Sequence, residues 1–398
     1  MSRLAMVERE QLPESDRRFY DAVKAIRRRP VSGPFIVTLN SSPDLASRFA
    51  HLGHYFHSRG QADESILSAR VRTFVALVGS RALDVPYEWN AWVGWALEAG
   101  VTQETVDALR ENKQPAQLTG EETLALAVCR QLIAGDHRID EATFHAAHHQ
   151  FGIQGMVELA MTLGYFAMIA YPLNAFEIEM SNAQKALRKP FEPLAVPSHP
   201  GDVPCTRAHP SLRSAATNKT RAPMLREHGD LKPADQHFLD RVIRTRGHIS
   251  PIYQVLLHTP DVADRVASCG EFFLYEGLLS QRLRQLIGLI TAREFDSNYV
   301  WVAHTGAAHL PVDTCDTIAA GSESLALPAQ ELLAARFCRQ LLRGNHHVDD
   351  TTYAATTAVF GVPATIQIAA TLGYNAMMAF VANAFDIAPD STAYLPLL

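Results

Sequence analysis

The chain is internally duplicated, and this duplication limits the folds it can adopt more than any other feature of the sequence. Identical residues recur at three nearly equal shifts along the chain. The matching segments are 67–96 with 279–308 at a shift of 212 positions, 129–132 with 338–341 and 162–165 with 371–374 at a shift of 209, and Pro34 with Pro251 at a shift of 217. The small differences between the shifts indicate short insertions. One structural unit is therefore expected to occur twice.

The 398 residues divide naturally into two copies of this unit. The segment between them is rich in Pro, Ser and Thr and has no sustained apolar period, which is typical of a linker. We predict a first domain over 1–182, a linker over 183–222 and a second domain over 223–398. Each copy is long enough to bury a core of its own.

Both copies contain sequence patterns typical of helix ends, and neither contains patterns typical of strands. Thr119 and Glu122 have the spacing of a capping box at the start of an apolar stretch with helical period. The segments 140–152 and 349–361 each begin with Asp and end with Gly, as helices commonly do. The sequence therefore predicts an all-α fold, with a helical bundle in each copy.

Charge and composition exclude several classes of partner. A net charge of −6 provides no basic field for nucleic acid, so no nucleic-acid partner is expected. The charged N-terminus lacks the apolar core of a signal peptide, which favours a cytoplasmic protein. The charge-free runs 159–176 and 364–385 are long enough to span a bilayer, but their polar residues favour helices buried in a core or a subunit interface, without a membrane partner.

The second copy contains a helix pair that could carry chemistry. In the stretch 278–294, Gln285, Gly288 and Ala292 form a small, partly polar stripe that leaves room for a cavity. The next helix begins near residue 298 and places Trp301 and His304 on one face. These residues could line a pocket, or His304 could be a core histidine that is satisfied by a backbone carbonyl.

The ordered residues of both copies resemble the carboxymuconolactone decarboxylase group of the AhpD-like superfamily. The residues that carry the resemblance are Leu67, Arg70, Arg72, Tyr87, Glu88 and Trp89 in the first copy, and Leu279, Arg282, Arg284, Tyr299, Trp301 and His304 in the second. The resemblance implies two tandem AhpD-like helical domains, assembly into trimers or hexamers, and a site in a helical pocket. It also implies that His304 is the family's histidine and that Gln285 stands where the family usually has Glu.

The departures from the family pattern narrow the chemistry. The peroxidase members carry C-x-x-C, whereas this chain has Ser297 and Val300 at those positions in the second copy and no C-x-x-C pair anywhere. Thiol peroxidase activity is therefore excluded. The first copy has Trp92 and Thr73 in place of the histidine and the glutamate, which predicts a degenerate, supporting domain.

Two histidine clusters and an arginine pair offer other possibilities. The clusters are His51, His54 and His57, and His145, His148 and His149. Their spacing would suit a metal, but the second copy has no counterpart and acidic partners are lacking, so we expect solvated histidines and no metal. Arg282 and Arg284 could hold a substrate carboxylate or form structural ion pairs.

The leading hypothesis is a cofactor-independent enzyme that decarboxylates or isomerises a small carboxylated or enolisable compound. His304 and Gln285 would be the catalytic residues, and the substrate would lie against Arg282, Arg284, Tyr299 and Trp301. A homo-oligomer is expected. The alternatives are a non-catalytic binding or scaffold protein and a tailoring enzyme that promotes cyclisation or dehydration by shape and hydrogen bonding.

Overall fold

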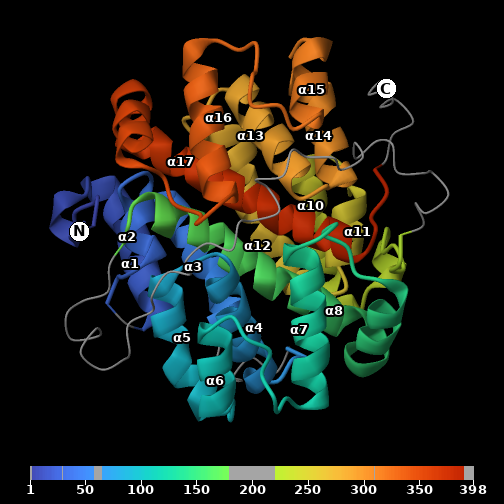
Figure 1. Ribbon diagram of the computed structural model, residues 1–398. Helices are drawn as coiled ribbons and strands as arrows, with labels where there is room; N and C mark the ends of the chain where they lie inside the picture. Colours follow the sequence, from blue (N-terminus) through green and yellow to red (C-terminus); the bar gives the residue numbers. More distant parts are fainter. Residues whose placement is uncertain (1, 29, 58–64, 179–219, 309, 390–398) are drawn as a thin grey trace.

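A computed structural model describes residues 2–28, 30–57, 65–178, 220–308 and 310–389 (Figure 1). Within these ranges every regular element is a helix and there are no strands, which confirms the all-α prediction. The predicted linker 183–222 lies outside the described residues except for its last three positions.

The helices of the two copies correspond one to one. The first copy contains α1 (Arg17–Arg27), α2 (Pro34–Leu39), α3 (Pro43–His57), α4 (Ala69–Ala82), α5 (Pro86–Glu98), α6 (Gln103–Arg110), α7 (Gly120–Ile133) and α8 (Glu141–Ala175). The second contains α10 (Gln236–Arg246), α11 (Pro251–Leu256), α12 (Pro260–Glu271), α13 (Gln281–Glu294), α14 (Asn298–Ala308), α15 (Val312–Ala319), α16 (Ala329–Leu342) and α17 (Asp350–Ala384). Short helical turns lie at Arg9–Gln11, Glu14–Asp16, His228–Asp230, Pro233–Asp235 and, as a π-helix after α12, Phe272–Glu276.

Local signals in the sequence set where the helices begin and bend. The Thr119 hydroxyl accepts from Glu122 N–H and the Glu122 carboxylate accepts from Thr119 N–H, so the predicted capping box is confirmed. Gly152 in α8 and Gly361 in α17 have φ of 66° and 76°, values that suit glycine. Each long helix is therefore two helices joined at a bend, where the sequence predicted a helix end.

The long helices α8 and α17 cross at the centre of the molecule (Figure 1). The two helices come close together at equivalent glycines, where Gly164 packs on Met377 and Gly373 packs on Met168. A Cβ on Gly373 would lie 2.6 Å from the carbonyl oxygen of Met168, so no larger residue fits without moving the backbone. The crossing relates the two copies by a local two-fold pseudosymmetry.

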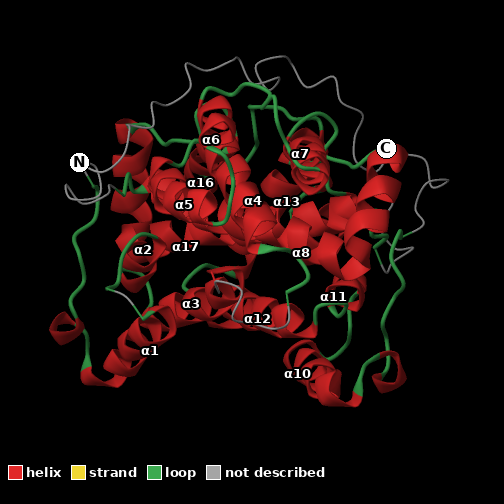
Figure 2. Cartoon of the chain, turned by 90° about the horizontal axis from the view of Figure 1, so that it is seen from below, coloured by secondary structure: helices red, strands yellow, loops and turns green. Residues whose placement is uncertain are grey.

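A second layer repeats the same reciprocal contact. Figure 2 shows α1 with α3 on one side and α10 with α12 on the other. Arg48 of α3 donates to the carbonyl oxygen of Ser268 in α12 at 2.7 Å, and Arg265 of α12 donates to that of His51 in α3. These four residues are equivalent in pairs at a shift of 217, so the interface is the same from either side.

The equivalent residues Arg3 and Arg221 clamp the two copies together. The backbone N–H of Arg3 donates to Phe176 O in its own copy at 2.9 Å, while its guanidinium pairs with Asp350 of the other copy at 2.6 Å. The matching partners of Arg221 are Phe385 O in its own copy, and Ile139 O and Glu141 in the first. Each copy thus supplies hydrogen-bond acceptors and a carboxylate to the arginine of the other copy.

The buried apolar side chains of both copies form one continuous cluster, so the halves share a core, and the domain boundaries stay predictions. The helices α8 and α17 are long and apolar enough to cross a membrane by length and composition. All residues of 155–176 and 365–385 are buried in the molecule. Core helices of globular proteins have the same composition, so these helices are weak evidence for a membrane.

Candidate functional site

His304 lies between three helices of the second copy. Its side chain projects from α14 towards α13, where Nδ1 contacts the side-chain amide of Gln285. On the other side, Nε2 lies 2.9 Å from Oδ1 of Asn375 in α17. The structure therefore brings together Gln285 and His304, which the sequence singled out, with Asn375, which it did not.

The amide of Asn375 sets the tautomer of the imidazole. Its Nδ2 donates to the carbonyl oxygen of Thr371 at 3.0 Å, which directs Oδ1 towards His304. An amide oxygen only accepts, so Nε2 of His304 carries the proton of that bond. In a neutral imidazole Nδ1 then accepts, and Gln285 satisfies it after a half-turn of the amide that exchanges its Oε1 and Nε2.

Burial keeps this imidazole neutral. Removal of the ring from water lowers the pKa of His304 from 6.5 to about 4, and the hydrogen bond with Asn375 opposes part of that effect. Gln285 is itself buried and carries no charge that would favour an imidazolium. At neutral pH the centre is therefore an uncharged chain of two amides and one imidazole.

Gly288 allows His304 to reach α13. A Cβ at this position would lie 2.5 Å from three atoms of the imidazole ring, so the ring rests directly on the glycine backbone. The small stripe of Gln285 and Gly288 thus does face His304, but the ring itself occupies the room above Gly288.

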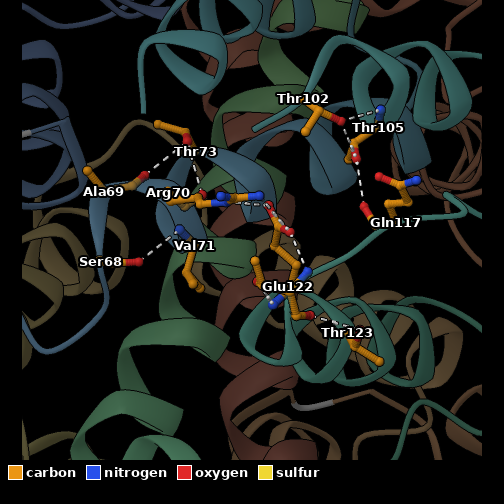
Figure 3. A network of polar contacts seen from close by, with 11 residues as sticks. Ser68, Ala69, Arg70, Val71, Thr73, Thr102, Thr105, Gln117, Glu122 and Thr123 are labelled. Carbon is orange, nitrogen blue, oxygen red and sulfur yellow. Dashed lines mark hydrogen bonds and ion pairs between the residues drawn. The ribbon is translucent and has the colours of Figure 1, made fainter. Parts of the chain in front are cut away.

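Arg282 and Arg284, which could hold a substrate carboxylate, have different partners. Arg282 forms an ion pair with Glu331 of α16, and the equivalent Arg70 forms the same pair with Glu122 of α7. Figure 3 shows Arg70 reaching from α4 to Glu122, which also belongs to the capping box of α7. Because this pair recurs in both copies, its role is to join helices.

Arg284 occupies a different environment from its counterpart Arg72. Glu158 lies close enough to Arg72 for its charge to favour the protonated guanidinium, and it is replaced by Gln367 in the second copy. The Nη1 of Arg284 donates to the carbonyl oxygen of Leu279 at 2.9 Å, and no ion pair of Arg284 occurs in the described part of the chain. Burial lowers the pKa of Arg284.

The aromatic residues of the predicted pocket pack into the core. Trp301 is only 1% exposed, and the equivalent Trp89 is 2% exposed. Tyr299 is partly buried against the same core. Their recurrence in both copies is explained by packing, and their contact with a substrate stays a prediction.

The first copy replaces the polar centre with an aromatic one. Trp92 stands at the position of His304 and packs edge-to-face on Phe166, which stands at the position of Asn375, with ring centroids 5.1 Å apart. Its indole N–H donates to the buried carboxylate of Glu88 at 3.0 Å. Thr73, at the position of Gln285, turns its hydroxyl back to the carbonyl oxygen of Ala69.

A cavity of about 170 Å³ lies beside this aromatic centre. Residues of α3, α4 and α5 form its wall: Phe56, His57, Ala69, Arg72, Thr73, Trp92, Trp95, Glu98 and Ala99. The copy predicted to be degenerate therefore has an open space at the equivalent place.

The histidine clusters contain no metal site within the described residues, where no group of three or more His, Cys, Asp or Glu side chains could hold a metal ion. His51, His54, His145, His148 and His149 are all exposed. His57 differs from them, because its ring lies tilted against Trp92 and lines the cavity.

No known protein family, curated protein or solved structure matches this chain closely enough to indicate a common origin. The resemblance to the carboxymuconolactone decarboxylase group thus stays a prediction.

Comparison of the two copies could have found Asn375. At the shift of 209 it aligns with Phe166, a polar-for-aromatic exchange within two otherwise similar helices. The exchange at His304 and Trp92 was visible, but its partner lies 71 residues away and needed the same comparison further along the chain.

Proposed function

We propose that the chain is a cofactor-independent enzyme of the carboxymuconolactone decarboxylase type, which uses His304 to decarboxylate or isomerise a small carboxylated or enolisable compound. The observation that carries the proposal is a coordinated exchange at three positions. Thr73, Trp92 and Phe166 of the first copy correspond to Gln285, His304 and Asn375 of the second. Packing alone would not require three polar groups in mutual contact.

The chemistry follows from the neutral state of the imidazole. Loss of carbon dioxide or of a proton from an enolisable acid leaves an electron pair that is stabilised on a neighbouring carbonyl oxygen. The Nε2–H of His304 would donate to that oxygen in place of Asn375, as a neutral electrophile. The proton that completes the product at carbon would come from Nε2 of the same imidazole, which would then regain a proton from water.

Arg284 is the better candidate of the two arginines for the substrate carboxylate. Arg282 is already paired with Glu331, and an arginine in such a pair gains little from a second carboxylate. Arg284 directly precedes Gln285 on α13, and its guanidinium donates to the backbone carbonyl oxygen of Leu279. A carboxylate would form charge-assisted hydrogen bonds with its remaining N–H groups.

The test is turnover of a panel of carboxylated butenolide lactones, measured by release of carbon dioxide and by the change in ultraviolet absorbance of the conjugated lactone. His304→Ala should lower kcat by about 10² to 10⁴, the usual effect of removing a positioned acid or base. Trp92→Phe, the matched change in the first copy, should leave kcat nearly unchanged. Turnover of His304→Ala at the wild-type rate would refute the assignment.

A binding or scaffold protein is the second candidate, and one observation favours it. Both nitrogens of His304 are satisfied by side-chain amides, as expected of a structural histidine. If this reading holds, no lactone is turned over, and His304→Ala lowers stability without affecting any bound compound.

A further inference from the structure

The cavity of the first copy has walls that suit a flat ring. The indoles of Trp92 and Trp95 meet at 88° with centroids 4.7 Å apart, so they form a perpendicular corner. The His57 ring lies over Trp92 at 4.8 Å, and Phe56 lines the same space. An aromatic guest would pack on the partly exposed Trp95, while the buried rings of Trp92 and Phe56 form the inner end of the cavity.

The size of the cavity suits a guest of one ring. Its volume is about 170 Å³, whereas an apolar cavity of about 150 Å³ accommodates benzene. One six-membered ring with a small substituent fits within the walls, and because the cavity is partly open, a larger compound would extend out of it. Ala69 and Ala99 leave this room open.

The polar side chains of the wall determine the substituent. Arg72 is 4% exposed, and it keeps a positive charge at the wall although burial lowers its pKa, an effect that the nearby charge of Glu158 opposes. Glu98 is exposed, so water and salt screen its charge. Of the two charged side chains that line the cavity, the less screened one is therefore positive, while the buried carboxylates of Glu158 and Glu88 lie beside Arg72 and Trp92 without lining it.

A substituent that reaches Arg72 directly is favoured as a hydroxyl or carboxylate over an amine. The Thr73 hydroxyl donates to Ala69 O, so its oxygen can accept from a hydroxyl substituent, and the ring N–H of His57 can donate to a hydroxyl or a carboxylate.

We propose that this cavity is a second ligand site, separate from His304, for a single-ring aromatic compound with one hydroxyl or carboxylate substituent. The site does not transfer protons through residue 92, because an indole cannot act as an acid or base near neutral pH. Its proposed role is to bind a ligand, which gives the copy that lacks a counterpart of His304 a role beyond supporting the fold.

Direct binding to the whole chain tests the proposal. Phenol, benzoate and benzylamine are titrated by calorimetry and by the fluorescence of Trp92 and Trp95, which line the cavity. Phenol or benzoate should bind at least tenfold more tightly than benzylamine. His304→Ala should bind them as the wild type does, because His304 belongs to the other copy.

Variants of the wall separate binding in the cavity from binding elsewhere. Ala69→Gln introduces the residue that the second copy has at this position, Gln281, and should weaken binding at least tenfold by filling the space. Ala146→Gln makes the same change at an exposed position of α8 and should have no effect. If Ala69→Gln does not fold, Trp95→Ala replaces it, since it removes one wall of a partly exposed corner.

Three results would overturn the proposal. The first is that neither phenol nor benzoate binds the wild type at millimolar concentration. The second is that benzylamine binds more tightly than both. The third is that the folded wall variant, Ala69→Gln or Trp95→Ala, binds like the Ala146→Gln control.

Discussion

Replacement of Gln285 by glutamate would test the geometry of the His304 centre without any substrate. In the wild type the imidazole is held by two neutral amides, and burial lowers its pKa to about 4. Gln285→Glu places a carboxylate against Nδ1. An imidazolium can donate from both nitrogens, to this carboxylate and to Oδ1 of Asn375, so the protonated state gains two acceptors. The pKa of His304 should therefore rise.

The size of the increase follows from the contact. Opposite charges about 4 Å apart attract by about 4 kcal/mol at an effective dielectric constant of about 20, which corresponds to about 3 pH units. Gln285 is 7% exposed, so the new carboxylate loses hydration and part of this attraction is cancelled. We expect an increase of about 1 to 3 pH units, which brings the pKa of His304 to between about 5 and about 7.

The same shift changes how stability depends on pH. Between pH 6.5 and about pH 4, His304 is protonated more fully in the unfolded wild type than in the folded protein. Protonation therefore favours the unfolded state, and His304 lowers the stability of the protein as the pH falls through this range. A higher pKa of His304 in the folded state narrows this pH range. Gln285→Glu should therefore lose less stability between pH 7 and pH 5 than the wild type, as far as His304 is concerned.

Nuclear magnetic resonance titration of the His304 ring measures the pKa directly. Gln254→Glu is the matched control, because Gln254 is 8% exposed and its amide oxygen accepts from Arg226, away from His304. It should leave the His304 titration unchanged. If the pKa of His304 in Gln285→Glu stays near 4 or falls, Gln285 does not contact the imidazole in solution, and the proposed centre is wrong.

Three further predictions concern packing, thiols and assembly. Gly288→Ala should lower stability by about 1 to 3 kcal/mol, because its Cβ would overlap the His304 ring, while Gly120→Ala, which meets nothing within 4 Å, should be close to neutral in chemical denaturation. Burial raises the pKa of all four cysteines of the described residues, Cys129, Cys269, Cys315 and Cys338, so thiol reagents should react slowly with them in the native protein. Rapid native labelling of any of them would contradict this. Light scattering should give a multiple of 43.9 kDa at micromolar concentration, and a monomer would contradict the predicted homo-oligomer.

The helical class and many helix ends could be predicted because their signals are local. The capping box at Thr119 and the glycine at 152 act within one or two turns of the chain, so composition and spacing are enough to recognise them. The duplication is also a property of the sequence alone, since identical residues recur in order. Helices that are equivalent by this duplication make equivalent contacts in the structure, such as those of Arg48 and Arg265.

Which residues meet in the candidate site depends on contacts between distant parts of the chain, and local sequence patterns do not reveal these contacts. His304 meets Gln285 across 19 residues and Asn375 across 71, and these separations become contacts only because α13, α14 and α17 pack together. The cavity beside Trp92 is likewise a space left between three helices, whose volume depends on how the surrounding side chains pack. A sequence lists the residues of such a space, but the packing of the helices decides whether it is filled, as above Gly288, or open, as beside Ala69.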